Sequence, residues 1–126
     1  MSINGLGESL FNAWRGICYV FKHEQNFRLQ IYTAVLVLFA VWYFALTRAE
    51  MVVIFLLIFL VLILELLNSA VEKMADVLKP RLSLQIHSIK DIMAGMVLIS
   101  SLGALIVGII IFYPHVVEWV NNQLRF

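Results

Sequence analysis

Charge is scarce in this 126-residue chain, because only 13% of its residues are charged, about half the share of an ordinary soluble domain. Nine basic residues face eight acidic ones, so the basic surplus of a nucleic-acid-binding protein is absent. Cysteine is almost missing as well, and the single Cys18 excludes a disulfide scaffold. Hydrophobic residues make up 63% of the chain, which excludes a disordered protein. The class that remains is a small integral membrane protein with one domain over residues 1–126.

Long stretches without charge predict three transmembrane helices. The first covers residues 29–47 and, at about 1.5 Å per residue, nearly crosses a hydrocarbon core about 30 Å thick. The second covers 50–78, because apolar residues continue beyond Glu65, the first acidic residue inside this stretch. Pro80 is expected to end it. The third covers 91–114 and is expected to end near its proline. The predicted fold class is therefore an all-α integral membrane protein.

A fourth helix is predicted over about residues 6–22, ahead of the first span. Leu10, Trp14 and Ile17 recur at helical spacing there, while Asn12 lies on another face. This pattern is typical of an amphipathic helix on the cytoplasmic membrane surface. The residues leave two readings open, a membrane-anchoring arm or a part of the functional site.

Basic residues predict the orientation of the spans. Seven of the nine lie ahead of the first span, on the far end of the second predicted helix, which projects out of the bilayer, or between the second and third: Arg15, Lys22, Arg28, Lys73, Lys79, Arg81 and Lys90. By the positive-inside rule, the N-terminus and the second loop face the cytoplasm and the C-terminus faces outward. Small residues at Ser100, Ala104 and Gly108 allow another helix to approach closely, either in an oligomer or within the chain.

Acidic residues follow one face of the second predicted span. Glu65, Asn68, Glu72 and Asp76 are spaced at i, i+3, i+7 and i+11, which keeps them on the same side of a helix. A carboxylate inside a membrane is costly and marks a functional site by default. Packing does not explain this stripe, because apolar residues pack better and unpaired buried carboxylates take up protons.

Further charges stand at the same level of the other two spans. Glu24 precedes the first span, and Lys90 and Asp91 precede the third. Taken alone, Glu24 fits a solvated interfacial charge and Lys90 fits an ordinary topology signal. Together, three helices bring carboxylates to one cytoplasmic level.

Clustered carboxylates beside an amide favour a hard cation such as Mg²⁺, and a nearby lysine suits a phosphate. The sequence contains no Walker loop and no cysteine–histidine cluster with zinc spacing. Phosphoryl transfer needs only positioning, charge stabilisation and a base for the attacking hydroxyl. The acidic residue nearest the bilayer suits a base for a lipid alcohol, and those nearest the cytoplasm suit Mg²⁺ and nucleotide. A non-enzymatic scaffold or ion-conducting oligomer is the alternative, although residues 51–64 offer no polar pathway.

Four segments resemble the prokaryotic diacylglycerol kinase family. ELLNSAVE at 65–72, followed by Asp76, is similar to the family signature E-[LI]-L-N-[ST]-A-[IV]-E-x-x-x-D. KDIMAGMVL at 90–98 resembles K-D-x-x-A-G-A-V-L, and EQNFR at 24–28 resembles E-x-N-F-R. WRG at 14–16 matches the basic-glycine step of the family's surface helix. The resemblance covers about residues 10–116, in order and with matching spacing.

The resemblance implies a small homotrimeric kinase of the bacterial cytoplasmic (inner) membrane. Such a kinase transfers the γ-phosphoryl group of ATP to a lipid alcohol, with Mg²⁺, in sites shared between subunits. It implies Glu65 as general base and Glu24 and Glu72 as ligands of the metal carried by ATP. It implies four further nucleotide contacts: Asn12, Asp76, Lys90 and Asp91. It implies Asn68 and Arg28 as supporting residues.

The lipid alcohol is expected to be undecaprenol, with diacylglycerol next. The EQNFR form at 24–28, Ala94-Gly95 and the GIIIFYP ending at 108–114 look more like the undecaprenol kinase branch of the family.

Overall fold

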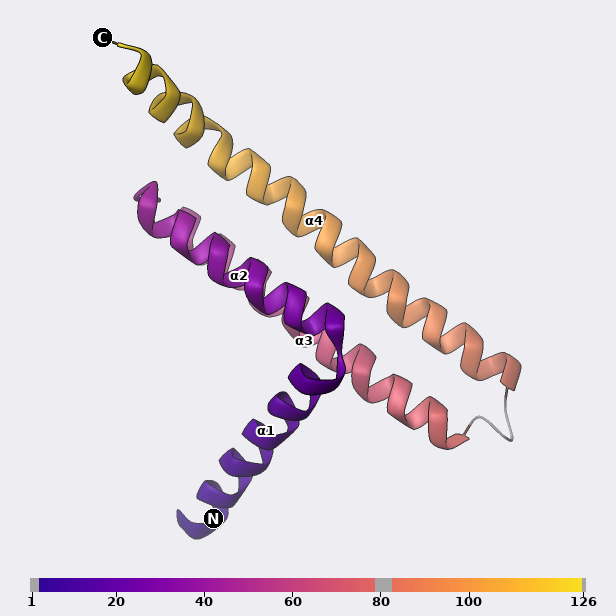
Figure 1. The fold of residues 1–126 in the computed structure, drawn as a ribbon. Coiled ribbons are helices and arrows are strands. Elements are labelled where there is room, and N and C mark those ends of the chain that lie inside the picture. Colours follow the sequence, from indigo (N-terminus) through magenta and orange to yellow (C-terminus); the bar gives the residue numbers. More distant parts are fainter. Residues whose placement is uncertain (1–2, 79–82, 126) are drawn as a thin grey trace.

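Four helices form the described part of the chain, residues 3–78 and 83–125, in the computed structural model (Figure 1). They are α1 (Ile3–His23), α2 (Gln25–Tyr43), α3 (Arg48–Leu78) and α4 (Ser83–Leu124). The helices α2, α3 and α4 are long and apolar enough to cross a membrane, as the sequence predicts. The expected stop at Pro80 and the basic residues Lys79 and Arg81 lie outside the described residues.

Successive long helices run in opposite directions, and α3 packs extensively on α4 and less on α2 (Figure 1). The 31 residues of α3 correspond to about 46 Å, so α3 exceeds a hydrocarbon core of about 30 Å. Its C-terminal part, which carries the acidic stripe, therefore has the length to project beyond the core.

Helix α4 is longer than the sequence suggests at both ends. It begins at Ser83 rather than near residue 91, and Ile86 in its second turn is buried. It also continues through Pro114 to Leu124 instead of ending at the proline. A proline costs a helix one hydrogen bond, a loss that membrane helices tolerate where neighbours support them. Here Trp119 Nε1 donates a hydrogen bond to Tyr43 Oη at 3.1 Å, which holds the extension against α2.

The turn between α2 and α3 explains why α2 ends at Tyr43 and not near residue 47. Ala45 has a φ of 49°, and its N–H donates to Trp42 O at 3.3 Å. The Leu46 N–H donates to Val41 O at 3.3 Å. These two bonds and the left-handed residue form a Schellman motif, which satisfies the last carbonyl groups of the helix. The Val41 and Leu46 side chains are buried together with Ile54 of α3, and this cluster is the core of the hairpin.

A capping box starts α3 directly after this turn. The Thr47 N–H donates to Glu50 Oε2 at 2.9 Å, and the Glu50 N–H donates to Thr47 Oγ1 at 3.3 Å. This reciprocal pair satisfies two free donors at the start of the helix. Glu50 also lies 3.1 Å from His115 Nε2 of α4. One carboxylate therefore caps α3 and joins it to α4.

Replacing Ala45 by glycine should stabilise the protein. Ala45 occupies the left-handed region, where a Cβ costs about 1–2 kcal/mol and glycine has no such penalty. After the entropy cost of glycine, we expect a gain of about 0.5–1 kcal/mol and a higher thermal midpoint in detergent. Ala49→Gly is the matched control, because Ala49 lies in the first turn of α3 and should lose stability there. Equal midpoints for the two variants would contradict this account of the turn.

Helix α1 leaves the bundle at an angle where α2 begins (Figure 1). Its predicted apolar face is uncovered in the single chain, since Leu10 and Trp14 are 64% and 65% exposed. The C-terminal part of α1 is tied to α3 by Lys73, whose Nζ lies 3.8 Å from the centroid of the Tyr19 ring. A position on the membrane surface stays a prediction, which the uncovered apolar face suits.

Candidate functional site

Glu65 is the most deeply buried acidic residue of the described chain, with an exposed fraction of 2%. It lies in α3, and its backbone carbonyl accepts a hydrogen bond from Ser69 Oγ at 3.0 Å. Ser69 is itself buried, so the backbone turn that carries Glu65 is fixed by a local bond. The sequence singles out Glu65 as the candidate base, and the structure gives it a dry environment in which a carboxylate is reactive.

The partner of Glu65 is Gln30 of α2, which the sequence argument did not select. Gln30 Nε2 donates to Glu65 Oε2 across 3.4 Å. The signal for it was present, since Gln30 is an amide in the otherwise apolar start of the first span. The interhelical bond brings the start of α2 to the middle of α3. The base candidate is thus supported from a second helix.

Glu24 precedes Gln30 by six residues at the start of α2, and Glu72 follows Glu65 by seven residues on α3. Helices α2 and α3 run in opposite directions, and Gln30 is bonded to Glu65. Glu24 and Glu72 therefore lie at about the same level, beyond Glu65. Glu24 is the N-cap residue of α2, yet its side chain makes no capping hydrogen bond and stays available. Glu72 lies about two turns after Glu65 on α3, and both Glu24 and Glu72 are half-buried. We call Glu24, Glu65 and Glu72 the acidic cluster. The acidic cluster contains carboxylates from α2 and α3, two of the three helices that the sequence predicts to carry carboxylates at one cytoplasmic level.

Arg28 secures the junction next to the acidic cluster. Its Nη1 donates to two carbonyl oxygens at the end of α1, Phe21 O at 3.0 Å and Lys22 O at 2.8 Å. These carbonyls would otherwise lack partners, because the last turn of a helix leaves them free. Arg28 therefore sets the angle between α1 and α2 and, with it, the position of Glu24.

The other predicted site residues lie around the acidic cluster without joining it. Within residues 3–78 and 83–125, no hydrogen bond or ion pair links them to the three glutamates: Asn12, Asn68, Asp76, Lys90 and Asp91. Asn68 and Lys90 are half-buried, while Asn12, Asp76 and Asp91 are exposed. Asp91 Oδ2 instead lies 3.8 Å from His87 Nε2 on the surface of α4. Within the described residues of a single chain, these predicted site residues are therefore not bonded to the acidic cluster.

The acidic cluster offers carboxylate oxygens, the type of ligand that Mg²⁺ prefers. No group of three or more metal-binding side chains comes together in the described residues. Mg²⁺ is usually held by one or two carboxylates and completes its octahedron with water and phosphate oxygens. Glu24 and Glu72 offer that number of oxygen ligands. The residues present therefore fit Mg²⁺ bound together with a phosphate donor.

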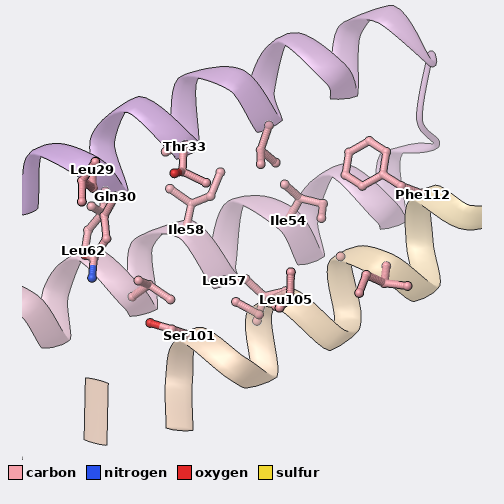
Figure 2. Close-up of a pocket in the computed structure, with 16 residues that line it drawn as sticks. Leu29, Gln30, Thr33, Ile54, Leu57, Ile58, Leu62, Ser101, Leu105 and Phe112 are labelled. Carbon is pink, nitrogen blue, oxygen red and sulfur yellow. The ribbon is translucent and has the colours of Figure 1, made fainter. Parts of the chain in front are cut away.

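An apolar groove of about 580 Å³ runs between α2, α3 and α4 (Figure 2). Gln30 lines its inner end, and Phe112 lines the end near the α2–α3 turn. Gln30, Thr33 and Ser101 are the polar side chains along a wall that is otherwise almost entirely hydrocarbon (Figure 2). Glu65 does not line the groove itself, but Gln30 does and donates a hydrogen bond to Glu65, so one side chain links the groove wall to the buried carboxylate.

Fold and site together define a small all-helical membrane protein with three candidate spans, an acidic cluster at one end and an apolar groove. Comparison with known proteins agrees with this class. The prokaryotic diacylglycerol kinase family model matches residues 11–112. The chain therefore belongs to the prokaryotic diacylglycerol kinase family, a family of lipid kinases.

Two characterised relatives were found. A diacylglycerol kinase of Synechocystis sp. is 37% identical over 103 residues, which are 81% of this chain and 59% of that protein. An undecaprenol kinase of Bacillus subtilis is 33% identical over 112 residues, which are 89% of this chain and 91% of that protein. The chain thus spans about three fifths of the first relative and nearly all of the second. No solved structure matches the chain.

Proposed function

We propose that the protein transfers the γ-phosphoryl group of ATP to the hydroxyl of a membrane lipid alcohol. The observation that carries this proposal is the buried Glu65, which accepts a hydrogen bond from the groove-lining Gln30 and has two further glutamates beyond it on α2 and α3. An apolar groove suits a hydrocarbon tail, and the acidic cluster suits Mg²⁺ and the phosphates of a nucleotide. The acceptor and the donor would therefore meet at Glu65.

In the proposed reaction, Glu65 receives the proton of the acceptor hydroxyl. The alcohol oxygen forms the new bond to the γ-phosphorus, and the bond from that phosphorus to the β–γ bridging oxygen breaks. Glu24 and Glu72 would hold the nucleotide through the magnesium that it carries, and a magnesium ion bound there would supply positive charge beside the phosphates. Burial of Glu65 keeps water away from the reacting hydroxyl, which favours transfer to lipid over hydrolysis.

The nucleotide contacts are proposed to be completed by a neighbouring subunit of a homotrimer. Within the described residues, Asn12, Lys90 and Asp91 form no hydrogen bond or ion pair with the acidic cluster of their own chain. With the N-terminus and the α3–α4 connection in the cytoplasm, the acidic cluster would face cytoplasmic ATP. Asp76 and Asn68 would support the same site.

Undecaprenol is the acceptor we favour, with diacylglycerol second. The undecaprenol kinase of Bacillus subtilis is aligned over 91% of its length, whereas the diacylglycerol kinase of Synechocystis is aligned over 59%. We expect the purified protein, in detergent or lipid, to phosphorylate either alcohol only when Mg²⁺ and ATP are present. In competition at equal concentrations, undecaprenyl phosphate should be the main radiolabelled product. No Mg²⁺-dependent turnover with either alcohol would overturn the proposed function, and a preference for diacylglycerol would overturn the choice of acceptor alone.

A further inference from the structure

Among the described residues, Gln30 is the groove-lining side chain that donates a hydrogen bond to the buried carboxylate. Its Nε2 donates to Glu65 Oε2, and its Oε1 is buried without a hydrogen-bond partner. An unpaired buried oxygen costs about 1–3 kcal/mol. An apolar side chain of similar length would fill the same space without this cost, so packing does not account for an amide here.

The bond from Gln30 makes the two oxygens of Glu65 inequivalent. Oε2 is held by the amide, which leaves Oε1 as the oxygen that receives a proton from an acceptor. A base of fixed orientation is worth more than a free one, because reactivity depends on the angle and distance of the reacting atoms. The present 3.4 Å separation is long for an N–H···O bond. Such bonds in a free enzyme often shorten when the substrate binds.

The groove supplies a reason for that shortening. Gln30 forms part of the groove wall beside Leu29 and Leu62, so a hydrocarbon chain in the groove contacts the Gln30 side chain directly (Figure 2). Contact from that side restricts the amide to the position nearest Glu65. Occupation of the groove and orientation of the carboxylate are then linked through one residue.

We propose that Gln30 is a positioning residue that couples the hydrocarbon chain of the acceptor in the groove to the orientation of Glu65. This inference rests on the proposed lipid kinase function. It adds that the hydrocarbon part of the acceptor, and not its hydroxyl alone, controls the rate of phosphoryl transfer.

The test replaces Gln30 by Met, which has similar length and an apolar side chain but no N–H donor. Turnover is measured with a long-chain and a short-chain form of the same alcohol, at varied Mg-ATP. A hydrogen bond to a carboxylate is worth about 10- to 100-fold in rate, so kcat of Gln30→Met with the long alcohol should fall by roughly that factor. The KM values for alcohol and Mg-ATP should stay within about twofold, since neither binding surface has lost a contact.

The chain-length comparison tests the coupling itself. In the wild type, the long alcohol should give a kcat about tenfold higher than the short one, because remote contacts are used to orient the reacting groups. This ratio should approach one in Gln30→Met. Gln123→Met, the same change at an exposed position near the end of α4, serves as the control and should behave as the wild type.

Several results would overturn the coupling while leaving the kinase function intact. They are an unchanged kcat in Gln30→Met, a chain-length ratio that survives in this variant, and a wild type without such a ratio. A rise of both KM values together with a lower thermal midpoint would assign Gln30 to the fold instead. Gln30→Glu keeps the size of the side chain but removes the donor and adds a like charge, so its kcat should be at or below that of Gln30→Met. A wild type that phosphorylates no alcohol would overturn the proposed function itself.

Discussion

Glu65→Gln should abolish nearly all lipid phosphorylation while nucleotide binding survives. The substitution keeps the size of the side chain and removes its capacity to accept a proton at neutral pH. General-base catalysis contributes about 10²- to 10⁴-fold to rate, and we expect a loss of kcat of that order. Glu65 is buried and its carboxylate faces Gln30 rather than solvent. The loss should therefore appear in the chemical step and not in the capture of ATP.

Two measurements separate these effects. Turnover of radiolabelled ATP with saturating lipid alcohol reports the chemical step, and calorimetry with Mg²⁺ and a non-hydrolysable ATP analogue reports binding. Glu118→Gln removes an exposed carboxylate from the far end of α4 and is the matched control for both. Weakened nucleotide binding with kcat preserved would reverse the assignment and place Glu65 among the nucleotide contacts.

Much of the fold follows from the pattern of charge. Uncharged runs predicted the three long helices because a membrane selects length and hydrophobicity, and both can be read directly from the sequence. The ends of the helices were harder to predict. Ala45 ends α2 with a left-handed residue that is usually glycine, so no turn signal was visible. Helix α4 continues past Pro114, and two of its residues beyond the proline bond to the other helices. Trp119 bonds to Tyr43 of α2, and His115 bonds to Glu50 of α3.

The acidic cluster shows a similar division. Glu65 and Glu72 share a face of α3 through helical spacing, which depends on the sequence alone. The approach of Glu24 depends on the angle between α1 and α2, and Arg28 sets this angle through bonds to the end of α1. The bond from Gln30 depends on how α2 packs on α3. Such contacts between helices have no local signature, so only the structure reveals them.

Glu72→Gln and Glu24→Gln should weaken the use of Mg-ATP more than they slow the chemical step. Each variant removes one of the two carboxylate charges that suit the nucleotide's magnesium in the acidic cluster. Loss of a ligating charge should raise the Mg²⁺ concentration for half-maximal turnover about 10- to 100-fold, the usual range for a weakened metal site. The KM of the lipid alcohol should change little, because neither glutamate lines the apolar groove.

The combination of these variants tests whether the two carboxylates act on the same ion. If Glu24 and Glu72 share one magnesium, the effects of the single variants should not add in Glu24→Gln/Glu72→Gln, because the second change removes a ligand from a site already lost. Titration of turnover with Mg²⁺ at fixed ATP measures each variant, and Glu118→Gln again controls for loss of charge alone. Additive effects would indicate two separate ions or two separate roles. An unchanged Mg²⁺ dependence in both single variants would refute the metal role of the acidic cluster. The nucleotide would then have to be held by other predicted contacts, namely Asn12, Lys90 and Asp91.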